Sequence, residues 1–280
     1  IISLFSSIET IGIKLKNVEM IRQKSVTKNM RIVAISDTHG YLPKNLPEGD
    51  ILCICGDIVP LDYQSDLCKS VAWFTLEFVP WVDSLPYKKV IFIGGNHDFF
   101  LEALHKIPKK RVDSGEVLST FISTPRRVLE KLLPGNNKGK HSKLVYLCDN
   151  SVEIEGKRFY GVPYVTSLPG WAFNRDADFL KSEIYSNIPR KVDVLLTHMP
   201  PRCLCMGEVQ QKNAFNYMEN YGSAELADAI AKRDIKYVIC GHVHSGCHDF
   251  QTKGETTYVN VSLRDENYNI GYPATVFDLE

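Results

Sequence analysis

Polar side chains of one chemical kind follow five separate apolar runs along this chain. Each run is short and apolar enough to form a buried β-strand, and each is followed closely by Asp, Asn or His. In chain order the segments are Asp37-Thr-His39, Gly56-Asp57, Gly95-Asn96-His97-Asp98, Thr197-His198 and Gly241-His242-Val-His244. Because open α/β sheets form their binding crevices at the carboxyl ends of their strands, we expect these segments to meet at one site.

The combination of the five segments carries the prediction, since each segment alone is weak evidence. A lone Gly-Asp pair is usually a turn, and Asp98 suits a helix N-cap as well as a catalytic role. Together the segments offer oxygen and imidazole ligands without a thiolate, which suits hard or borderline divalent cations. Two such cations side by side are typical of enzymes that hydrolyse phosphate esters. His105, His141 and His248 lack this strand-end context and are not included.

The order of the remaining elements predicts an α/β fold. Helical periodicity fits Asp66–Leu85, which Pro80 should bend or break, and also Ser182–Asn187 and Ser223–Arg233. This mixture predicts stacked sheets with helices on their outer faces. The expected strands are Arg31–Ser36, Ile51–Cys55, Lys89–Ile93, Leu144–Leu147, Ser151–Ile154, Arg158–Val162, Val192–Leu196, Tyr237–Cys240, Thr257–Val261 and Thr275–Phe277.

The domain organisation follows from length and local composition. A chain of 280 residues fits one large domain or two small ones. Met30 has the character of a domain start, so we expect 1–29 to be an N-terminal extension outside the core fold and 30–280 to be one domain. The stretch 106–143 is rich in Lys, Arg, Pro, Gly and Asn, with a helix expected over Gly115–Leu133. It fits an insertion beside the site and a solvated charged loop equally well.

Composition narrows the expected partners and location. The 33 basic and 33 acidic residues balance, so nucleic acid is not the expected partner. No apolar run approaches the roughly 20 residues that span a bilayer, so no membrane partner is expected. Cys53, Cys55 and Cys240 lie within apolar runs, which favours buried thiols in a reducing compartment, here the cytoplasm. Cys203-Leu-Cys205 follows His198 and two prolines, which favours a loop, with a soft-metal or redox role as the alternative.

The five segments, in this order, resemble the signature of the calcineurin-like metallophosphoesterase superfamily. Within it, Gly161-Val-Pro-Tyr164, Gly170-Trp-Ala-Phe-Asn174, Tyr221-Gly-Ser-Ala-Glu-Leu226 and the run from Thr256 to Ser262 are similar to the small metallophosphoesterase-domain phosphodiesterases related to the vertebrate brain proteins. The resemblance covers roughly residues 30–280. It implies a four-layer αββα sandwich of two mixed β-sheets flanked by helices.

The resemblance also implies roles for individual residues. The first metal ion is implied to take Asp37, His39, Asp57 and His244, and the second Asp57, Asn96, His198 and His242, so that Asp57 bridges the two. Mn²⁺ is the expected ion, and Fe, Zn²⁺ and Ni²⁺ are compatible with the same ligands. His97 is the implied proton donor to the leaving oxygen. The implied reaction is attack of a bridging hydroxide on a small phosphodiester, either a cyclic nucleotide or a nucleotide-derived ester.

One departure from the superfamily pattern bears on the substrate. Protein serine/threonine phosphatases of the superfamily carry Gly-Asp-x-Val-Asp-Arg-Gly, whereas this chain has Gly56-Asp-Ile-Val-Pro60-Leu-Asp62. The Asp that orients the catalytic His and the phosphate-binding Arg are both replaced, and Asp62 is the candidate substitute for the first. This favours a diester over a phosphoprotein. A phosphomonoesterase and a non-catalytic metal-binding scaffold of the same fold remain alternatives.

Three aromatic residues offer a further hypothesis about substrate binding. Tyr164, Trp171 and Phe173 could form an aromatic wall for a base or aryl leaving group, although isolated aromatic residues more often belong to a core. The sequence leaves the natural substrate and the oligomeric state open.

Overall fold

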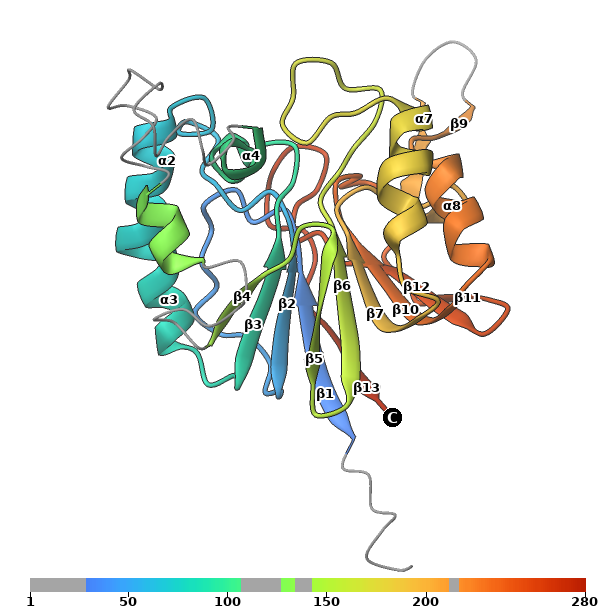
Figure 1. Cartoon of the computed structure of the whole chain (residues 1–280), viewed down its shortest axis with the longest axis horizontal. Helices are drawn as coiled ribbons and strands as arrows, with labels where there is room; N and C mark the ends of the chain where they lie inside the picture. Colours follow the sequence, from blue (N-terminus) through green and yellow to red (C-terminus); the bar gives the residue numbers. More distant parts are fainter. Residues whose placement is uncertain (1–28, 107–126, 134–142, 212–216) are drawn as a thin grey trace, which may run out of the picture.

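The computed structural model of this chain describes residues 29–106, 127–133, 143–211 and 217–280 (Figure 1). Apart from Asn29, the predicted N-terminal extension lies outside the described residues. So does most of the predicted insertion at 106–143. Of the helix expected over Gly115–Leu133, residues 127–132 are helical, and the earlier part of that range lies outside the described residues.

Two β-sheets form the centre of the molecule. The first has the strand order β13-β1-β2-β3-β4 and the second the order β11-β12-β10-β7-β6-β5. Within each sheet the central strands are parallel, whereas β13, β5 and β11 pair antiparallel with their neighbours. The first sheet comprises β1 Met30–Ile35, β2 Ile51–Cys55, β3 Lys89–Ile93, β4 Leu144–Tyr146 and β13 Thr275–Leu279. The second comprises β5 Asn150–Ile154, β6 Lys157–Val162, β7 Lys191–Thr197, β10 Asp234–Cys240, β11 Gln251–Lys253 and β12 Thr256–Asn260.

Helices cover the outer face of each sheet, and the two inner faces pack on each other (Figure 1). The inner layer joins side chains of both sheets, for example Ile32 and Ile51 with Val194 and Ile239. All five residues of β2 are buried, since the strand is covered on both faces. These layers confirm the predicted αββα sandwich. The helices are α2 Leu67–Trp73, η1 Phe74–Phe78, α3 Val79–Ser84 and α4 Phe99–Lys106 on one side, and α7 Ala177–Phe179, η2 Leu180–Ile184, η3 Tyr185–Asn187 and α8 Ala224–Ala231 on the other.

The helix expected around Pro80 continues through the proline instead of breaking. Asp66 caps its start by accepting a hydrogen bond from the backbone N–H of Lys69 at 3.0 Å. The segment η1, which immediately precedes Val79 and Pro80, is π-helical. A π-turn shifts the backbone hydrogen-bond pattern and can absorb the donor that proline lacks. The ten expected strands are all present, with ends that differ by up to three residues.

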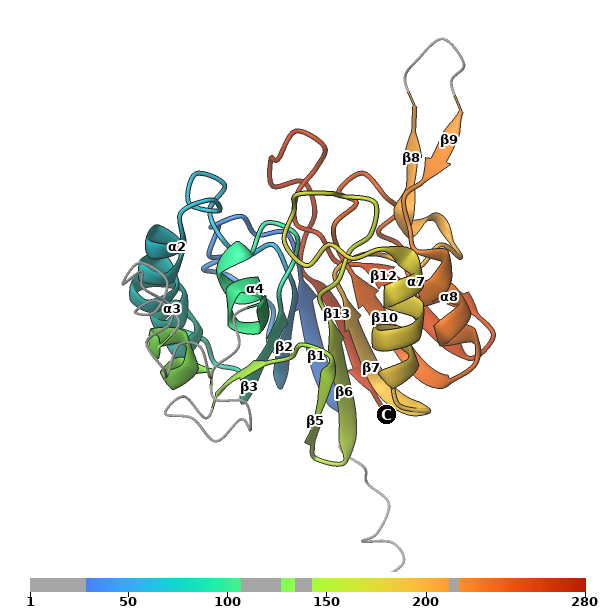
Figure 2. The same ribbon diagram turned by 45° about the horizontal axis from the view of Figure 1, so that its top comes forward.

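Sequence patterns missed three short strands. β8 Glu208–Gln210 and β9 Met218–Asn220 form a two-stranded hairpin that projects from the body of the molecule (Figure 2). β11 is an edge strand of three residues. Strands this short carry too few alternations for a period of two to be recognised.

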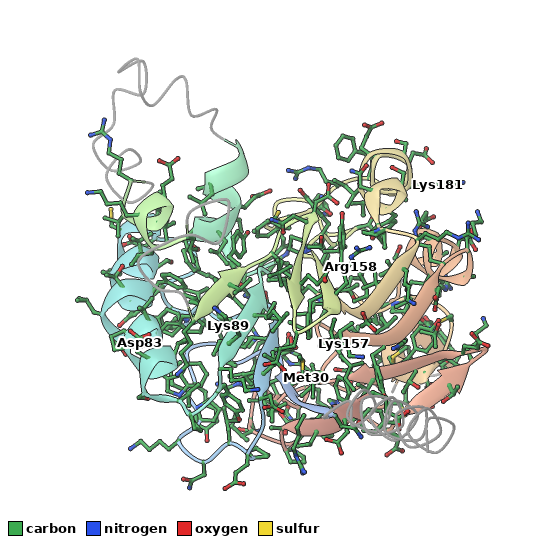
Figure 3. All side chains as sticks on the ribbon, turned by 60° about the horizontal axis from the view of Figure 1, so that its bottom comes forward. Met30, Asp83, Lys89, Lys157, Arg158 and Lys181 are labelled. Atoms are coloured by element: carbon green, nitrogen blue, oxygen red, sulfur yellow. The ribbon has the colours of Figure 1, made fainter. Side chains whose placement is uncertain are left out.

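The parallel strands of both sheets start at the same end of the molecule. Figure 3 looks at this end and labels Met30, Lys89 and Lys157, which begin β1, β3 and β6. The carboxyl ends of these strands, and the loops that follow them, therefore lie at the opposite end. In the part of the chain that the structure describes, no helix has the length and apolar character needed to pass through a bilayer.

Candidate metal centre

The loops that follow β1 and β2 run side by side at the carboxyl end of the first sheet. The backbone N–H of Asp37 donates to the carbonyl of Gly56 at 3.0 Å, and that of His39 donates to the carbonyl of Asp57 at 2.9 Å. These bonds continue the pairing of the two strands beyond their ends. As a result, the carboxylates of Asp37 and Asp57 are both buried beneath the same surface.

Asp57 lies at the centre of the site. Its Oδ1 accepts a hydrogen bond from the backbone N–H of His97 at 2.8 Å. Its Oδ2 faces three imidazoles, with Nε2 of His198 at 3.3 Å, of His97 at 3.7 Å and of His39 at 4.0 Å. One carboxylate therefore joins loops that follow β1, β3 and β7.

Asp37 connects the first sheet to the loop that follows β10. Its Oδ1 lies 3.4 Å from Nε2 of His244, and its Oδ2 accepts the backbone N–H of His242 at 3.0 Å. The other ring nitrogen of His244 is 3.0 Å from the carbonyl of Asp265. Such a bond fixes the orientation of the imidazole and leaves Nε2 turned toward the site.

His198 is held in the same way from the second sheet. Its Nδ1 donates to the carbonyl of Cys55 at 2.8 Å, so Nε2 faces the site. That nitrogen lies 3.0 Å from Oδ1 of Asn96, which follows β3. The ring of His242 is next to it, with 5.0 Å between the two ring centroids. All eight residues singled out in the sequence thus lie around one centre.

Two glycines make this close approach possible. A Cβ on Gly95 would lie 2.3 Å from Oδ1 of Asp57, so a side chain there would displace the central carboxylate. Gly56 has a φ of +95°, a backbone conformation that side chains disfavour, and a Cβ there would lie 2.7 Å from Nδ1 of His198. Neither position tolerates even a methyl group without moving a site residue.

Charge pairing sets the protonation of the buried groups. Burial by itself raises the pKa of Asp57, but the charges of His198 and His97 outweigh this and hold that pKa well below its usual value. Burial lowers the pKa of His198, yet the Asp57 carboxylate raises it to about 9 overall. Burial lowers the pKa of His39 and of His242 to about 4 each. Of these three imidazoles, that of His198 therefore favours the charged form beside the carboxylates, whereas those of His39 and His242 favour the neutral form.

The unsatisfied atoms of the site fit a divalent cation. Both ring nitrogens of His39 are buried and have no hydrogen-bond partner among the described residues. Burying unpaired polar atoms is costly, so such atoms usually indicate a missing ligand or ion. Three groups of side chains could each hold an ion: Asp37, His39 and His244; Asp37, Asp57 and His198; and His39, Asp57 and His97. These are oxygen and imidazole donors, as expected for Mn²⁺, Fe or Zn²⁺.

Backbone strain is concentrated in the same residues. Asp37, His39, Asp57 and His242 have φ values of 54°, 44°, 53° and 68°, in the left-handed region that non-glycine residues rarely occupy. Each such conformation costs of order 1–3 kcal/mol and persists only where the surroundings enforce it. Strain of this kind is typical of sites where side chains must be aimed at a ligand.

His97 is oriented by Gln64, not by Asp62. Its Nδ1 is in contact with Oε1 of Gln64, an amide oxygen that can only accept a hydrogen bond. Nδ1 therefore carries the proton, and Nε2 is directed toward Asp57. Asp62 is exposed, so the proposed substitution of Asp62 for the missing aspartate is wrong. Gln64 lies in an irregular loop, where sequence patterns give no signal.

Asp98 fastens the loops after β2 and β3 to each other. Its carboxylate accepts the backbone N–H groups of Ile58 at 3.1 Å, Val59 at 3.0 Å and Gly95 at 2.9 Å. Burial and the nearby Asp57 charge raise the pKa of Asp98 to about 7, although the three backbone bonds oppose this. Asp98 is completely buried and acts on Asp57 and Asn96 through the backbone that carries them.

The three predicted aromatic residues divide between the site and the core. The ring of Trp171 lies 4.6 Å from that of His97, centroid to centroid, so Trp171 borders the site. Phe173 is fully buried against Gly94, and Tyr164 packs on Phe173 at 5.8 Å, so both belong to the core. A continuous aromatic wall of all three is therefore wrong.

Tyr268 borders the opposite side of the site and was not predicted. Its ring centroid is 5.1 Å from that of His39 and 4.9 Å from that of His244. Arg264 holds this loop in place, because one guanidinium nitrogen donates to the carbonyl of Thr38 at 2.7 Å and another donates to the carbonyl of Tyr268. The loop lies far from the strand-end motifs in sequence and has no periodicity that could reveal it.

Comparison with known proteins agrees with this geometry. The sequence model of the calcineurin-like phosphoesterase family matches residues 30–246, which include every segment of the site. The chain belongs to the calcineurin-like phosphoesterase family. A UPF0046 protein of Caenorhabditis elegans is 34% identical over 258 residues, which cover 89% of this chain and 81% of that protein. Members of the family are generally hydrolases that use divalent metal ions.

Two further proteins are similar to this chain. The human protein called metallophosphoesterase domain-containing protein 1 is 32% identical over 254 residues, which cover 89% of this chain and 71% of the human protein. Among solved structures, a phosphopantetheinyl hydrolase from Mycobacterium tuberculosis is similar to this chain with a TM-score of 0.45 and 15% identity. That similarity covers 85% of this chain and 90% of the solved one.

Proposed function

We propose that this protein is a metal-dependent phosphodiesterase that hydrolyses a small substrate, such as a cyclic nucleotide or a nucleotide-derived ester. The observation that carries the proposal is the convergence of buried Asp and His side chains from both sheets around Asp57. Among them is His39, whose two ring nitrogens have no hydrogen-bond partner in the described part of the chain. An imidazole buried without partners has a clear physical explanation if it faces a cation.

Two cations would be held by the residues that line this centre. The first would be held by Asp37, His39, Asp57 and His244, of which Asp37, His39 and His244 have their ligand atoms close together. The second would be held by Asp57, Asn96, His198 and His242, where Nε2 of His198 lies 3.3 Å from Asp57 and 3.0 Å from Oδ1 of Asn96 and the ring of His242 is next to that of His198. Mn²⁺ is the ion we would test first. When bound, a pair of such ions polarises phosphoryl oxygens and lowers the pKa of water, which is the chemistry that phosphoester hydrolysis needs.

His97 is the residue we assign to the leaving group. Its ring lies 4.6 Å from that of Trp171, centroid to centroid, and its Nδ1 is held by Gln64. Because Nδ1–H donates to the amide oxygen, Nε2 is the nitrogen that would carry a second proton and pass it to the oxygen that departs. Burial lowers the pKa of His97, so the ring would give up this proton readily. A positioned acid of this kind contributes typically ~10²–10⁴-fold to a rate.

The lack of a cationic side chain in the segment Gly56–Asp62 supports a diester substrate. A phosphomonoester carries two negative charges and benefits from a cationic side chain beside the metals, whereas a diester carries one. Pro60 and Leu61 stand where the protein phosphatases of the superfamily have Asp and Arg.

Fully buried thiols at Cys53, Cys55 and Cys240 support a reducing location such as the cytoplasm.

A comparison of two chromogenic substrates tests the proposal. The protein is loaded with Mn²⁺ and assayed with bis-(p-nitrophenyl) phosphate and with p-nitrophenyl phosphate, before and after chelation. We expect a higher kcat/KM for the diester and loss of activity on chelation. A higher kcat/KM for the monoester would make the protein a phosphomonoesterase. Metal bound in elemental analysis without turnover of either substrate would indicate a scaffold.

A further inference from the structure

Two thiols outside the candidate metal centre lie against each other. Cys205 begins η4 Cys205–Gly207, in the loop that follows β7, and Cys247 lies in the loop that follows β10. The side-chain amide of Gln251 contacts both sulfur atoms, with Nε2 at 3.0 Å from Sγ of Cys247 and in closer contact with Sγ of Cys205. Two sulfurs that share one small amide nitrogen are themselves neighbours.

The backbones that carry these thiols are also in direct contact. The N–H of Cys247 donates to the carbonyl of Cys205 at 3.1 Å. A Cβ on Gly246 would lie 1.8 Å from the carbonyl oxygen of Met206, so the two segments touch without intervening side chains. The backbone bond and the shared Gln251 amide thus hold Cys205 and Cys247 next to each other, as a disulfide between them requires.

Cys240, the nearby cysteine at the end of β10, differs from this pair in its exposure. Cys240 is completely buried, with Sγ 3.6 Å from the carbonyl of Val259 and 4.0 Å from Sδ of Met206. Cys205 and Cys247 are both partly exposed, so a small oxidant in solution can reach them. This combination of exposure and proximity distinguishes the Cys205–Cys247 pair.

The pair is linked to two residues of the candidate metal centre through a short turn. Within this turn the N–H of Val243 donates to the carbonyl of Gly241 at 2.8 Å, and the N–H of Gly246 donates to the carbonyl of Val243 at 3.0 Å. Asn260 bridges the two segments, since its Nδ2 donates to the carbonyls of Val243 at 2.7 Å and of Met206 at 3.3 Å. The turn that holds Cys247 is thus the turn that presents His242 and His244.

We propose that Cys205 and Cys247 form a reversible disulfide when the protein meets hydrogen peroxide, and that this bond restrains the turn carrying His242 and His244. One thiolate attacks a peroxide oxygen, which gives a sulfenic acid and, after proton transfer, one water. The second thiol attacks the sulfenic sulfur, forms the S–S bond and releases a second water. The two thiols together lose two electrons and two protons, and the peroxide is reduced.

The electrostatic surroundings predict when the reaction is fastest. Burial, followed by a hydrogen bond with the Cys247 thiol, raises the pKa of the Cys205 thiol. Because the thiolate is the reactive form, oxidation should accelerate as the pH rises. In a reducing compartment a disulfide of this kind is transient, as expected of a regulatory bond and not of a structural one.

Peptide mapping of the folded protein tests the disulfide directly. The full chain is treated with hydrogen peroxide, its remaining thiols are alkylated, and it is digested without reduction for mass spectrometry. We expect a linked pair of peptides that contains Cys205 and Cys247 and that separates on reduction. Cys205→Ser and Cys247→Ser should abolish this pair, whereas the matched control Cys203→Ser, two residues away in the same loop, should retain it.

Other outcomes of the mapping would overturn the proposal. The proposal is wrong if Cys205 and Cys247 are recovered as alkylated peptides after a treatment that oxidises other cysteines. It is also wrong if Cys205 is found linked to Cys203. Peptide mapping uses neither a substrate nor a metal ion, so its result does not depend on the proposed phosphodiesterase activity. The wild-type map is decisive even if a serine variant fails to fold.

Hydrogen exchange tests the restraint on the turn. We expect the amides of residues 241–247 to exchange more slowly in the oxidised wild-type protein than in the reduced one. Cys247→Ser should exchange equally under both conditions. Equal exchange in oxidised and reduced wild-type protein would remove the link to the turn.

Discussion

Asp57 organises the candidate metal centre through both of its oxygens, one bonded to the backbone of His97 and the other turned toward the imidazoles of His39, His97 and His198. The sequence predicted these residues because each follows a strand, and the carboxyl ends of parallel strands meet. It could not predict Gln64 or Tyr268. These two residues lie in irregular loops whose positions depend on tertiary contacts, and no local period marks them.

At the same scale, His97 gives the first prediction. We expect His97→Ala to bind metal ions normally and to lower kcat by ~10²–10⁴-fold, because a positioned acid contributes that much. The measurement combines steady-state kinetics on the diester with elemental analysis of the purified variant. Asp62→Ala, an exposed change in the neighbouring loop, is the matched control and should leave both quantities unchanged. If the variant loses metal along with turnover, His97 is a ligand instead of an acid.

Asp98 gives the second prediction at this scale. Asp98→Ala leaves the buried N–H groups of Ile58, Val59 and Gly95 without their acceptor. Each unsatisfied buried donor costs about 1–3 kcal/mol, so the loss of the acceptor for three of them should lower the free energy of unfolding by at least about 3 kcal/mol. Urea denaturation monitored by circular dichroism measures this. Unfolding at the same urea concentration as the wild-type protein would show that these bonds contribute nothing.

At the scale of elements, the loop after β3 packs closely against the loop after β2 at the site. Three consecutive residues of this loop contribute to the site. Gly95 lets the loop pass close to Asp57, Asn96 is a candidate metal ligand, and His97 is a candidate acid. The strand and a helix start near Asp98 were predictable from the apolar run and the capping residue, and α4 does begin at Phe99. Nothing in the sequence indicated that Gly95 touches Asp57, because that contact joins residues of different strands.

Substitution of Gly95 tests this contact. We expect Gly95→Ala to lose bound metal and nearly all turnover, because its Cβ would lie 2.3 Å from Oδ1 of Asp57. Gly156→Ala is the control: Gly156 lies in the turn between β5 and β6, and a Cβ there meets nothing within 4 Å. That control should bind metal as the wild-type protein does. Elemental analysis and calorimetric titration with Mn²⁺ compare the two variants, and full metal content in Gly95→Ala would contradict the packing argument.

At the scale of the whole molecule, the site joins the two sheets. Asp37, Asp57 and Asn96 follow strands of the first sheet, whereas His198 and His244 follow strands of the second. The strands and their layered packing were predictable, since buried strands have clear apolar patterns. The pairing of β13 with β1 was not, because an antiparallel partner from the far end of the chain leaves no local mark.

Metal removal tests the coupling between the sheets. Ions that bind only the folded protein stabilise it by about 2.7 kcal/mol per site at free concentrations ~100 times Kd. We therefore expect chelation to lower the thermal unfolding midpoint by several degrees, and Mn²⁺ to restore it. Asn96→Ala should show a smaller response to Mn²⁺. A midpoint that is the same with chelator and with Mn²⁺ would argue against a site shared by the two sheets.

The antiparallel pairing of β1 with β13 has a consequence for folding during synthesis on the ribosome. β1 occupies Met30–Ile35, and the strand that completes its edge, Thr275–Leu279, is translated almost 250 residues later. Until then, one side of β1 presents unpaired backbone groups, which favour association with other chains. The nascent polypeptide therefore has a long interval in which a chaperone would be of use, and this interval ends only once Thr275–Leu279 has been synthesised.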